Sequence, residues 1–226
     1  MPVSDFLEVL SNYDIAGAYW LNLKLTFFSA IFALVLGTVL ALMRISPLPS
    51  LQWAGAAYVN LVRNIPLTVV MMFAAFVLWP QLGVQFADRF DANFFWLAVW
   101  ALSIYTASFV CESIRSGVNT VPLGQAEAAR AVGLSFLPAA RLVIMPQAFR
   151  GSIAPLGNTL IALIKNTTVA SAISVSEISL LMKGMVEQHG NYVIPIFLTV
   201  AAGFVVIVIP VGLAVTYLSQ RLAVSR

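Results

Sequence analysis

Long apolar stretches dominate the chain, and five of them reach the length of a membrane span. A spanning helix needs roughly 20 mostly apolar residues, because it rises about 1.5 Å per residue through a hydrocarbon core of about 30 Å. The pattern predicts spans at residues 20–43, 57–79, 94–113, 153–173 and 192–218. We therefore predict an all-α integral membrane protein of about five transmembrane helices, forming a single domain over residues 1–226.

Composition agrees with this pattern. Hydrophobic residues make up 61% of the chain and charged residues only 9%, whereas soluble domains carry about 25% charged residues. This small number of charges cannot cover a globular surface in water. The remaining, apolar surface must therefore face lipid. The net charge of +3 is too small and too dispersed to indicate nucleic-acid binding.

The charges also orient the predicted bundle. Basic residues gather in cytoplasmic loops, and eight of the twelve lie on the C-terminal side of the bilayer: Arg44, Arg63, Arg115, Arg130, Arg141, Arg150, Arg221 and Arg226. Seven of the nine acids lie on the opposite side: Asp5, Glu8, Asp14, Asp88, Asp91, Glu177 and Glu187. We therefore expect the N-terminus outside, the C-terminus in the cytoplasm, and a cytoplasmic loop at residues 116–150.

Small and charged residues within the spans predict particular packing contacts. Ala33, Gly37 and Ala41 place a small residue at every fourth position of the first span, which allows a second helix to approach closely. Glu112 and Arg115 are three positions apart at the end of the third span. That spacing predicts a salt bridge on the helix surface.

The cytoplasmic loop has the pattern of two short helices joined by a turn. Residues 125–132 are alanine-rich and favour a helix, and Gly133 is suited to terminate it. Ser135 can cap a second helix, and Glu127 can pair with Arg130 three positions later. From these residues alone, the loop is either a simple connection or a docking element for a partner.

A chain of motifs resembles one transporter family. Glu127-Ala128-Ala129, followed by Gly133 and by Ile144-Met145-Pro146, resembles the EAA signature of binding-protein-dependent ABC importer permeases. The flanks resemble the polar amino-acid (HisMQ-type) branch, through residues 58–67, 112–118, 121–125, 146–150 and 155–158. Residues 157–168 are most similar to glutamate-uptake permeases. Ser116 stands where many relatives have glycine, and Met145 where leucine is common.

The resemblance implies a MetI-like permease core in a bacterial cytoplasmic membrane. It places ATPase coupling at Glu127, Ala128, Ala129, Gly133 and Pro146. The implied partners are an ABC ATPase dimer, a second and related permease subunit, and an extracytoplasmic binding protein that delivers the amino acid. ATP and Mg²⁺ would be bound by the ATPase, so this chain is expected to hold no cofactor or metal and to be no enzyme.

The sequence itself is consistent with that division of roles. None of Lys24, Lys165 and Lys183 follows a glycine, which excludes a Gly-x-x-x-x-Gly-Lys phosphate-binding loop. His189 is the single histidine and falls in a predicted external loop. Neither a Ser-His-Asp triad nor a histidine-based metal site can therefore be assembled.

Polar residues within the fourth predicted span are candidates for a substrate pathway. Lys165 lies about twelve residues into that span, near the bilayer midplane. It could attract a substrate carboxylate, with Asn166, Thr167 and Thr168 as neutral donors. Alternatively, it could pair with an acid on a neighbouring helix or interrupt the span.

A second polar group lies in the first third of the second predicted span. Arg63 either extends its charge to the membrane interface or belongs with Asn64 to an inner gate. Pro66 is expected to bend the helix at this point.

The sequence therefore favours an ABC importer permease for a polar amino acid, with glutamate as the best single substrate. Glutamine, histidine and arginine remain alternative substrates. The rivals from other classes are a stand-alone secondary carrier, which leaves the EAA loop unexplained, and a membrane-embedded enzyme, for which the chain offers no catalytic set.

Overall fold

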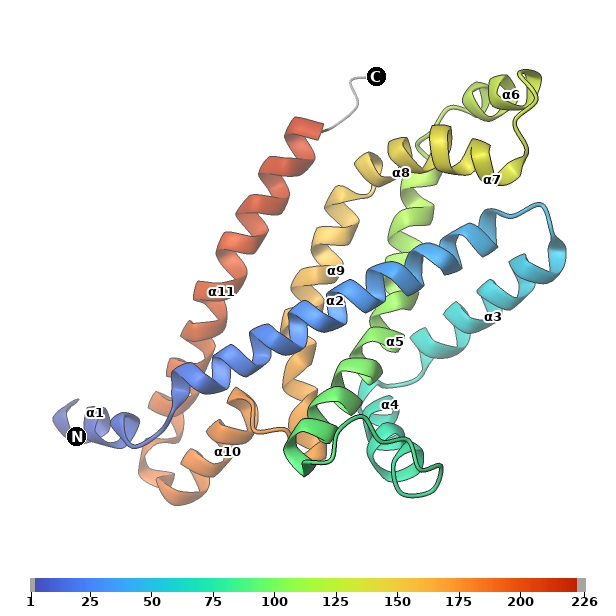
Figure 1. Cartoon of the computed structure of the whole chain (residues 1–226). Helices are drawn as coiled ribbons and strands as arrows, with labels where there is room; N and C mark the ends of the chain where they lie inside the picture. The colour runs from blue at the N-terminus through green and yellow to red at the C-terminus, as the bar shows by residue number, and fades with distance from the viewer. Residues whose placement is uncertain (1–2, 223–226) are drawn as a thin grey trace. The chain divides into compact units, whose positions relative to one another are not determined.

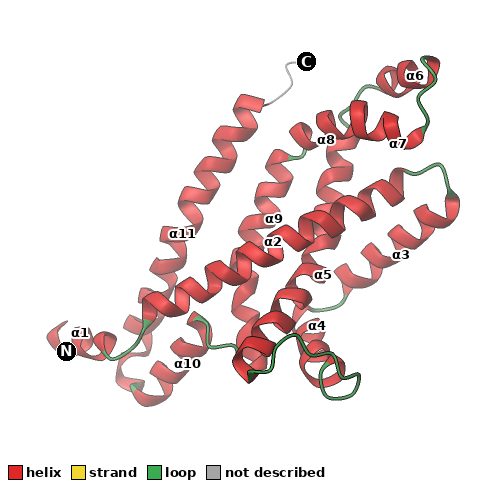
Figure 2. Ribbon diagram, viewed as in Figure 1, coloured by secondary structure: helices red, strands yellow, loops and turns green. Residues whose placement is uncertain are grey.

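The computed structural model describes residues 3–222, and these residues form helices connected by short loops, with no strand among them (Figure 2). The α-helices follow the order shown in Figure 1. They are α1 Val3–Ser11, α2 Ile15–Ile45, α3 Pro49–Asn64, α4 Leu67–Phe73, α5 Phe90–Val118, α6 Leu123–Ala131, α7 Phe136–Ala139, α8 Met145–Gly151, α9 Ile153–Asn166, α10 Ile178–Gln188 and α11 Val193–Leu222. Two π-helical turns, Ala74–Leu78 and Ala140–Ile144, and two 3-10 segments, Thr167–Ile173 and Gly190–Tyr192, connect some of them.

Three helical segments are long and apolar enough to cross a membrane: Ile15–Ile45, Phe90–Val118 and Gly190–Leu222. Two further segments qualify as spans broken at a short interruption, Pro49–Asn64 with Leu67–Leu78 and Ile153–Ile173 with Ile178–Gln188. The structure therefore has three spans, or up to five when each broken pair counts as one. The predicted all-α, multi-span architecture is confirmed.

Pro66 interrupts the second predicted span, as expected. Helix α3 ends at Asn64, and Ile65 has an extended backbone with φ −93° and ψ 133°. A residue before proline is forced into this region because the proline ring clashes with a helical backbone there. The predicted span at residues 57–79 is therefore two helices, since α4 begins only at Leu67.

The described chain divides into two compact units. The first unit comprises residues 3–29, 66–102 and 162–210, and the second comprises residues 30–65, 103–161 and 211–222. The single domain expected over residues 1–226 stays a prediction. Arg226, counted among the basic residues of the C-terminal side, lies outside the described residues.

In the first unit, α2, α10 and α11 pack through an apolar cluster. Ala18, Ile178 and Val200 are buried at its centre. The Tyr19 hydroxyl donates a hydrogen bond of 2.5 Å to the Val200 carbonyl, and its ring packs edge-on against Phe204 at 5.5 Å between centroids. This unit thus joins the beginning of α2 to two later elements of the chain.

In the second unit, the small residues of α2 form the predicted close helix contact. Ala33 and Ala41 are fully buried. A Cβ atom at Gly37 would overlap the side chain of Val110, so only glycine permits α2 and α5 to approach this closely. Buried residues of α3 and α8 complete the same core, among them Val59 and Met145.

Candidate functional site

The segment that carries the EAA signature forms two short helices joined by a turn, as predicted. Helix α6 covers Leu123–Ala131, close to the expected residues 125–132, and α7 covers Phe136–Ala139. Glu127 and Ala128 are exposed, whereas Ala129 is buried. One side of α6 therefore packs on the protein while the signature residues Glu127 and Ala128 remain free to contact a partner.

Gly133 terminates α6 by a Schellman motif. Its φ of +84° lies in the left-handed region that residues with a Cβ rarely adopt. The Gly133 amide donates to the Arg130 carbonyl at 2.9 Å, and the Leu134 amide donates to the Ala129 carbonyl at 3.0 Å. The turn therefore satisfies two carbonyls at the end of the helix and fixes the direction in which the chain continues to α7.

One local prediction for this segment is wrong, and another holds only for its position. No ion pair joins Glu127 to Arg130 within the part of the chain that the structure describes; both residues are exposed, where such a pair gains little. Ser135 stands at the N-cap of α7, but its side chain makes no capping hydrogen bond.

Large apolar side chains are exposed along this segment. Leu123, Val132, Leu137 and Leu142 are 82%, 76%, 64% and 66% exposed. None of them belongs to a candidate span. An exposed apolar group of this kind is typical of a protein-binding surface. We refer to residues 123–144 as the coupling segment, after the role that the resemblance implies for them, and to these four exposed residues as its apolar face.

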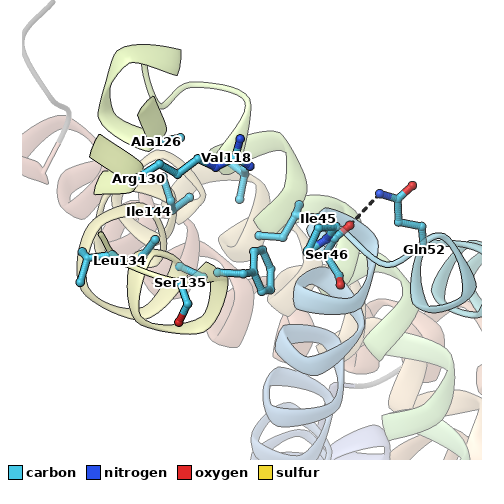
Figure 3. Close-up of a pocket in the computed structure, with 13 residues that line it drawn as sticks. Ile45, Ser46, Gln52, Val118, Ala126, Arg130, Leu134, Ser135 and Ile144 are labelled. Carbon is cyan, nitrogen blue, oxygen red and sulfur yellow. Dashed lines mark hydrogen bonds between the residues drawn. The ribbon is translucent and has the colours of Figure 1, made fainter. Parts of the chain in front are cut away.

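Two hollows flank the coupling segment. The larger has a volume of about 650 Å³, and Figure 3 shows part of its lining, including Ile45, Ala126 and Arg130. The smaller has a volume of about 360 Å³ and is lined in part by Leu137 and by Pro146 of the signature. The coupling segment is thus incompletely packed against the rest of the second unit.

Three arginines from three helices surround one carboxylate in the second unit. Arg115 lies 3.2 Å from Glu112, which confirms the predicted salt bridge. Arg44 of α2 also pairs with Glu112, and Arg63 of α3 lies 3.9 Å from it. The Arg63 guanidinium also stands over the ring of Phe109, 5.4 Å from its centroid. Glu112 therefore ties α2, α3 and α5 together near the ends of these helices.

The sequence revealed only one of these three ion pairs. Glu112 and Arg115 are close in the chain, but Arg44 and Arg63 are distant from Glu112 and reach it only through tertiary packing. Asn64, expected to act with Arg63, instead donates a hydrogen bond of 2.7 Å to the carbonyl of Asn60 in its own helix.

The polar residues of α9 and the following 3-10 segment do not all face the same way. Lys165 is exposed and Asn166 is half-buried. Thr167 is fully buried, and its hydroxyl accepts a hydrogen bond of 2.9 Å from Asn22. Thr168 donates to the Lys165 carbonyl at 2.7 Å. Thr167 is therefore part of the packing of the first unit, and Lys165 is left as the exposed cation of this group.

A buried polar network in the first unit was not expected from the sequence. Glu177 is fully buried and caps α10, accepting hydrogen bonds from the amides of Ser179 at 2.9 Å and Leu180 at 3.1 Å. Asn22 of α2 donates to the same carboxylate at 2.9 Å and accepts from the Ile178 amide at 3.1 Å. The network fixes the start of α10 to α2.

The charge pattern predicts that Glu177 lies in an external loop, but in the structure this acid is buried. Two signals in the sequence could have indicated the network: Asn22 is a lone amide in an apolar span, and Glu177 directly precedes an apolar helical pattern. A buried polar side chain needs a hydrogen-bonding partner. Each of the two residues therefore indicates that such a partner exists, but the sequence does not identify it.

Comparison with known proteins places the chain in a family. The family model of the binding-protein-dependent transport system inner membrane component matches residues 9–224. The glutamate transport system permease protein GluC of Corynebacterium glutamicum is 50% identical over 92% of this chain and 94% of its own length. The probable glutamine ABC transporter permease protein GlnM of Bacillus subtilis is 37% identical over 84% of this chain and 85% of its own length.

The fold has close counterparts among solved structures. A chain in the crystal structure of an amino acid ABC transporter with histidines is 26% identical to this one and superposes with a TM-score of 0.81, covering 98% of this chain and 100% of that chain. The resemblance to importer permeases, identified from the EAA signature, is confirmed. The chain is a multi-pass membrane protein, and it belongs to the family of inner membrane components of binding-protein-dependent transport systems.

Proposed function

We propose that this chain is the permease subunit of an ATP-driven glutamate importer. The assignment of glutamate as the substrate rests on one observation: the chain is 50% identical, over nearly the full length of both chains, to a permease named for glutamate transport. Permeases named for glutamine are also similar but less so, at 37% identity. Glutamine therefore stands as the second candidate substrate.

The partners proposed for the chain follow from the family and from the coupling segment. An ABC ATPase dimer, which binds ATP and Mg²⁺, is proposed to dock on the apolar face of the coupling segment, Leu123, Val132, Leu137 and Leu142. A second permease subunit and an extracytoplasmic amino-acid-binding protein complete the proposed complex. On this proposal the chain itself performs no catalysis.

The arginine cluster offers a route by which ATPase motion could reach the spans. Helix α5 ends at Val118, directly before the coupling segment, and Glu112 lies within its last two turns. Because Glu112 pairs with Arg44 of α2 and contacts Arg63 of α3, a displacement of α5 also acts on these two helices. We propose that the cluster makes the three helices move together when the ATPases close.

We propose that Lys165 faces the translocation pathway. A lysine at the middle of a span costs about 2.5–3.5 kcal/mol when it faces lipid, and Lys165 is exposed without an ion-pair partner among the described residues. A water-filled pathway would solvate the ammonium group and let it attract an anionic substrate. Asn166 and Thr168, its neighbours in the chain, are the neutral donors in this proposal. Arg63 and Asn64, at the helix break before Pro66, are proposed separately as part of an inner gate.

The proposed function predicts the outcome of a transport assay. Vesicles that contain the full complex should accumulate labelled glutamate only when ATP and the co-encoded binding protein are both present. An excess of unlabelled glutamate should abolish accumulation of the label, whereas equal concentrations of glutamine or arginine should leave most of it. If glutamine competes better than glutamate, the substrate is glutamine; accumulation without ATP would instead indicate a secondary carrier.

The proposed orientation predicts the labelling of introduced cysteines. On intact cells, Asp88→Cys and Glu187→Cys should react with a membrane-impermeant thiol reagent, while Gln125→Cys should react only after the membrane is opened. The native Cys111 is fully buried and gives little background. Labelling of position 125 from outside would contradict the positive-inside assignment of the coupling segment to the cytoplasm.

A further inference from the structure

The coupling segment leaves and rejoins the second unit at one tight contact between two helices. The contact joins Gly117, at the end of α5, to Ala148 of α8 and to Ser152 directly after α8, and all three residues are buried. A Cβ atom at Gly117 would overlap the carbonyl oxygen of Ala148 and the hydroxyl of Ser152. The Ala148 carbonyl belongs to the backbone and cannot rotate away, so a larger residue at position 117 would push α5 and α8 apart.

Hydrogen bonds and a second close approach stiffen this contact. The hydroxyl and the amide of Thr120 donate to the Gly117 carbonyl at 2.7 and 3.0 Å, and the Ser152 hydroxyl donates to the Ala148 carbonyl at 2.6 Å. Beside them, a Cβ atom at Gly151 would lie 2.5 Å from the Thr120 hydroxyl oxygen. The chain is therefore fixed at one place in the second unit both before and after the coupling segment.

Away from this contact, the coupling segment is packed loosely. The hollow of about 650 Å³ is lined by residues 45–47, Gln52 and Val118 outside the segment, and by residues between Ala126 and Ile144 within it (Figure 3). Protein interiors are otherwise packed so closely that few voids exceed the size of a water molecule. The segment is therefore anchored at its base and has room to move against the end of α2.

The second half of the segment is part of a helical rod that ends at the tight contact. From Phe136 to Gly151, α7, the π-helical turn and α8 follow one another without a non-helical residue. The junction residues Ala140 and Met145 both have right-handed helical backbones. At about 1.5 Å per residue the rod is roughly 20 Å long, and it carries Leu137 of the apolar face at its far end. A push on this face is therefore transmitted along the rod to the tight contact.

We propose that the contact of Gly117 with Ala148 is a pivot on which the coupling segment turns as a lever when the ATPases close. The hollow gives the segment room to turn, and the pivot passes the motion to α5. Glu112 precedes Gly117 in the same helix, so the motion reaches the arginine cluster and with it α2 and α3. Gly117 is then a positioning residue for transport. This inference rests on the proposed function, because it needs an ATPase to move the lever.

Two cross-links in the complete transporter, reconstituted in vesicles, test the pivot and the turning motion separately. In Thr120→Cys/Gly151→Cys the two side chains meet beside the pivot, close enough for a disulfide. Glutamate uptake per ATP hydrolysed should be the same before and after this disulfide forms, because the contact stays closed throughout the cycle. In Gln52→Cys/Ser135→Cys, a short bifunctional maleimide across the hollow should abolish uptake, whereas a monofunctional maleimide should not. Cys111 is fully buried and should not react.

Either cross-link can overturn the inference. Loss of uptake when the disulfide forms would show that the contact between α5 and α8 has to open during transport, so that it is no pivot. Uptake that survives the cross-link across the hollow would show that the coupling segment does not turn against the end of α2.

Gly117→Ala tests the pivot without a cross-link. The added methyl group forces α5 and α8 apart, so the glutamate taken up per ATP hydrolysed should fall several-fold while the complex still hydrolyses ATP. Gly184→Ala is the matched control, since no atom lies within 4 Å of the place that its Cβ would take, and it should keep the wild-type ratio. A purely structural role of Gly117 would lower abundance, uptake and ATP hydrolysis together and leave the ratio unchanged. That result would overturn the pivot.

The pivot and the proposed function fail in different ways. If the wild type carries glutamine instead of glutamate, only the proposed substrate is wrong, and the same ratio is measured with glutamine. A wild type that accumulates no amino acid in the presence of ATP and the binding protein would overturn the proposed function, and the lever with it. An unchanged ratio in Gly117→Ala, with ATP-driven uptake by the wild type, would overturn the pivot alone.

Discussion

Lys165→Met is expected to lower glutamate uptake by about tenfold or more while the protein still assembles in the membrane. Methionine keeps much of the length of lysine and removes the charge, so the variant tests the ammonium group itself. Lys165 is exposed and packs into neither of the two apolar clusters described above, so its loss should leave no cavity. A tenfold loss corresponds to about 1.4 kcal/mol of transition-state stabilisation, a modest contribution for a full charge near an anionic substrate.

Uptake and membrane abundance must be measured together for this variant. Lys165→Arg keeps the charge and should retain a substantial part of the uptake. Lys183→Met is a matched control, because it removes another exposed lysine by the same substitution in α10. Wild-type uptake by Lys165→Met would refute the pathway role of the lysine, and a failure of the variant to accumulate in the membrane would assign the lysine to packing instead.

The elements of the fold were largely predictable because a membrane imposes a simple rule on sequence. A stretch of about 20 apolar residues must be helical in hydrocarbon, since every backbone group needs an internal partner. The helices α2, α5 and α11 follow directly from that rule. The break at Pro66 was also predictable, because proline restricts the residue that precedes it. The extent of α2 beyond residues 20–43 was not, because ends outside the apolar core are set by local capping.

The connections between distant residues could not be predicted in the same way. Nothing in the sequence identifies Arg44 and Arg63 as partners of Glu112, because both pairs depend on how α2, α3 and α5 pack. Asn22 and Glu177 are separated by 155 positions and meet only in the folded first unit. Periodicity determines which face of an element is apolar, whereas ion pairs and buried networks need the tertiary arrangement.

The turn at Gly133 is explained by its backbone geometry, and it also lies beside the surface on which the ATPase is proposed to dock. The sequence predicted a helix stop there, and the Schellman motif explains it: a residue with a Cβ costs about 1–2 kcal/mol at a left-handed φ such as +84°. No atom lies within 4 Å of where a Cβ would be, so a side chain at this position would extend into open space. Beside it stands Val132, which is 76% exposed and belongs to the apolar face proposed to receive the ATPase.

Gly133→Asp is therefore expected to abolish ATP-driven uptake without changing the ligand affinity of the binding protein. The carboxylate places an unpaired charge on an apolar docking surface, which costs several-fold more than backbone strain alone. Gly133→Asn, which tolerates the left-handed backbone and carries no charge, should retain more uptake than Gly133→Asp. Glu127→Ala should reduce uptake less severely, because it removes one exposed signature side chain and leaves the turn intact.

Gly124→Asp is the matched control for this experiment. Gly124 lies in the first turn of α6 and has no positive φ, and no atom lies within 4 Å of the place that a Cβ would take. The variant adds the same charge beside Leu123 of the apolar face, but an acid there is favourable to the helix dipole and leaves the turn at Gly133 intact. It should therefore lose less uptake than Gly133→Asp. Normal transport by Gly133→Asp would refute the coupling role of the turn. Equal inactivation of both variants would show that any added charge on α6 disrupts docking, and that the geometry of Gly133 has no special part in it.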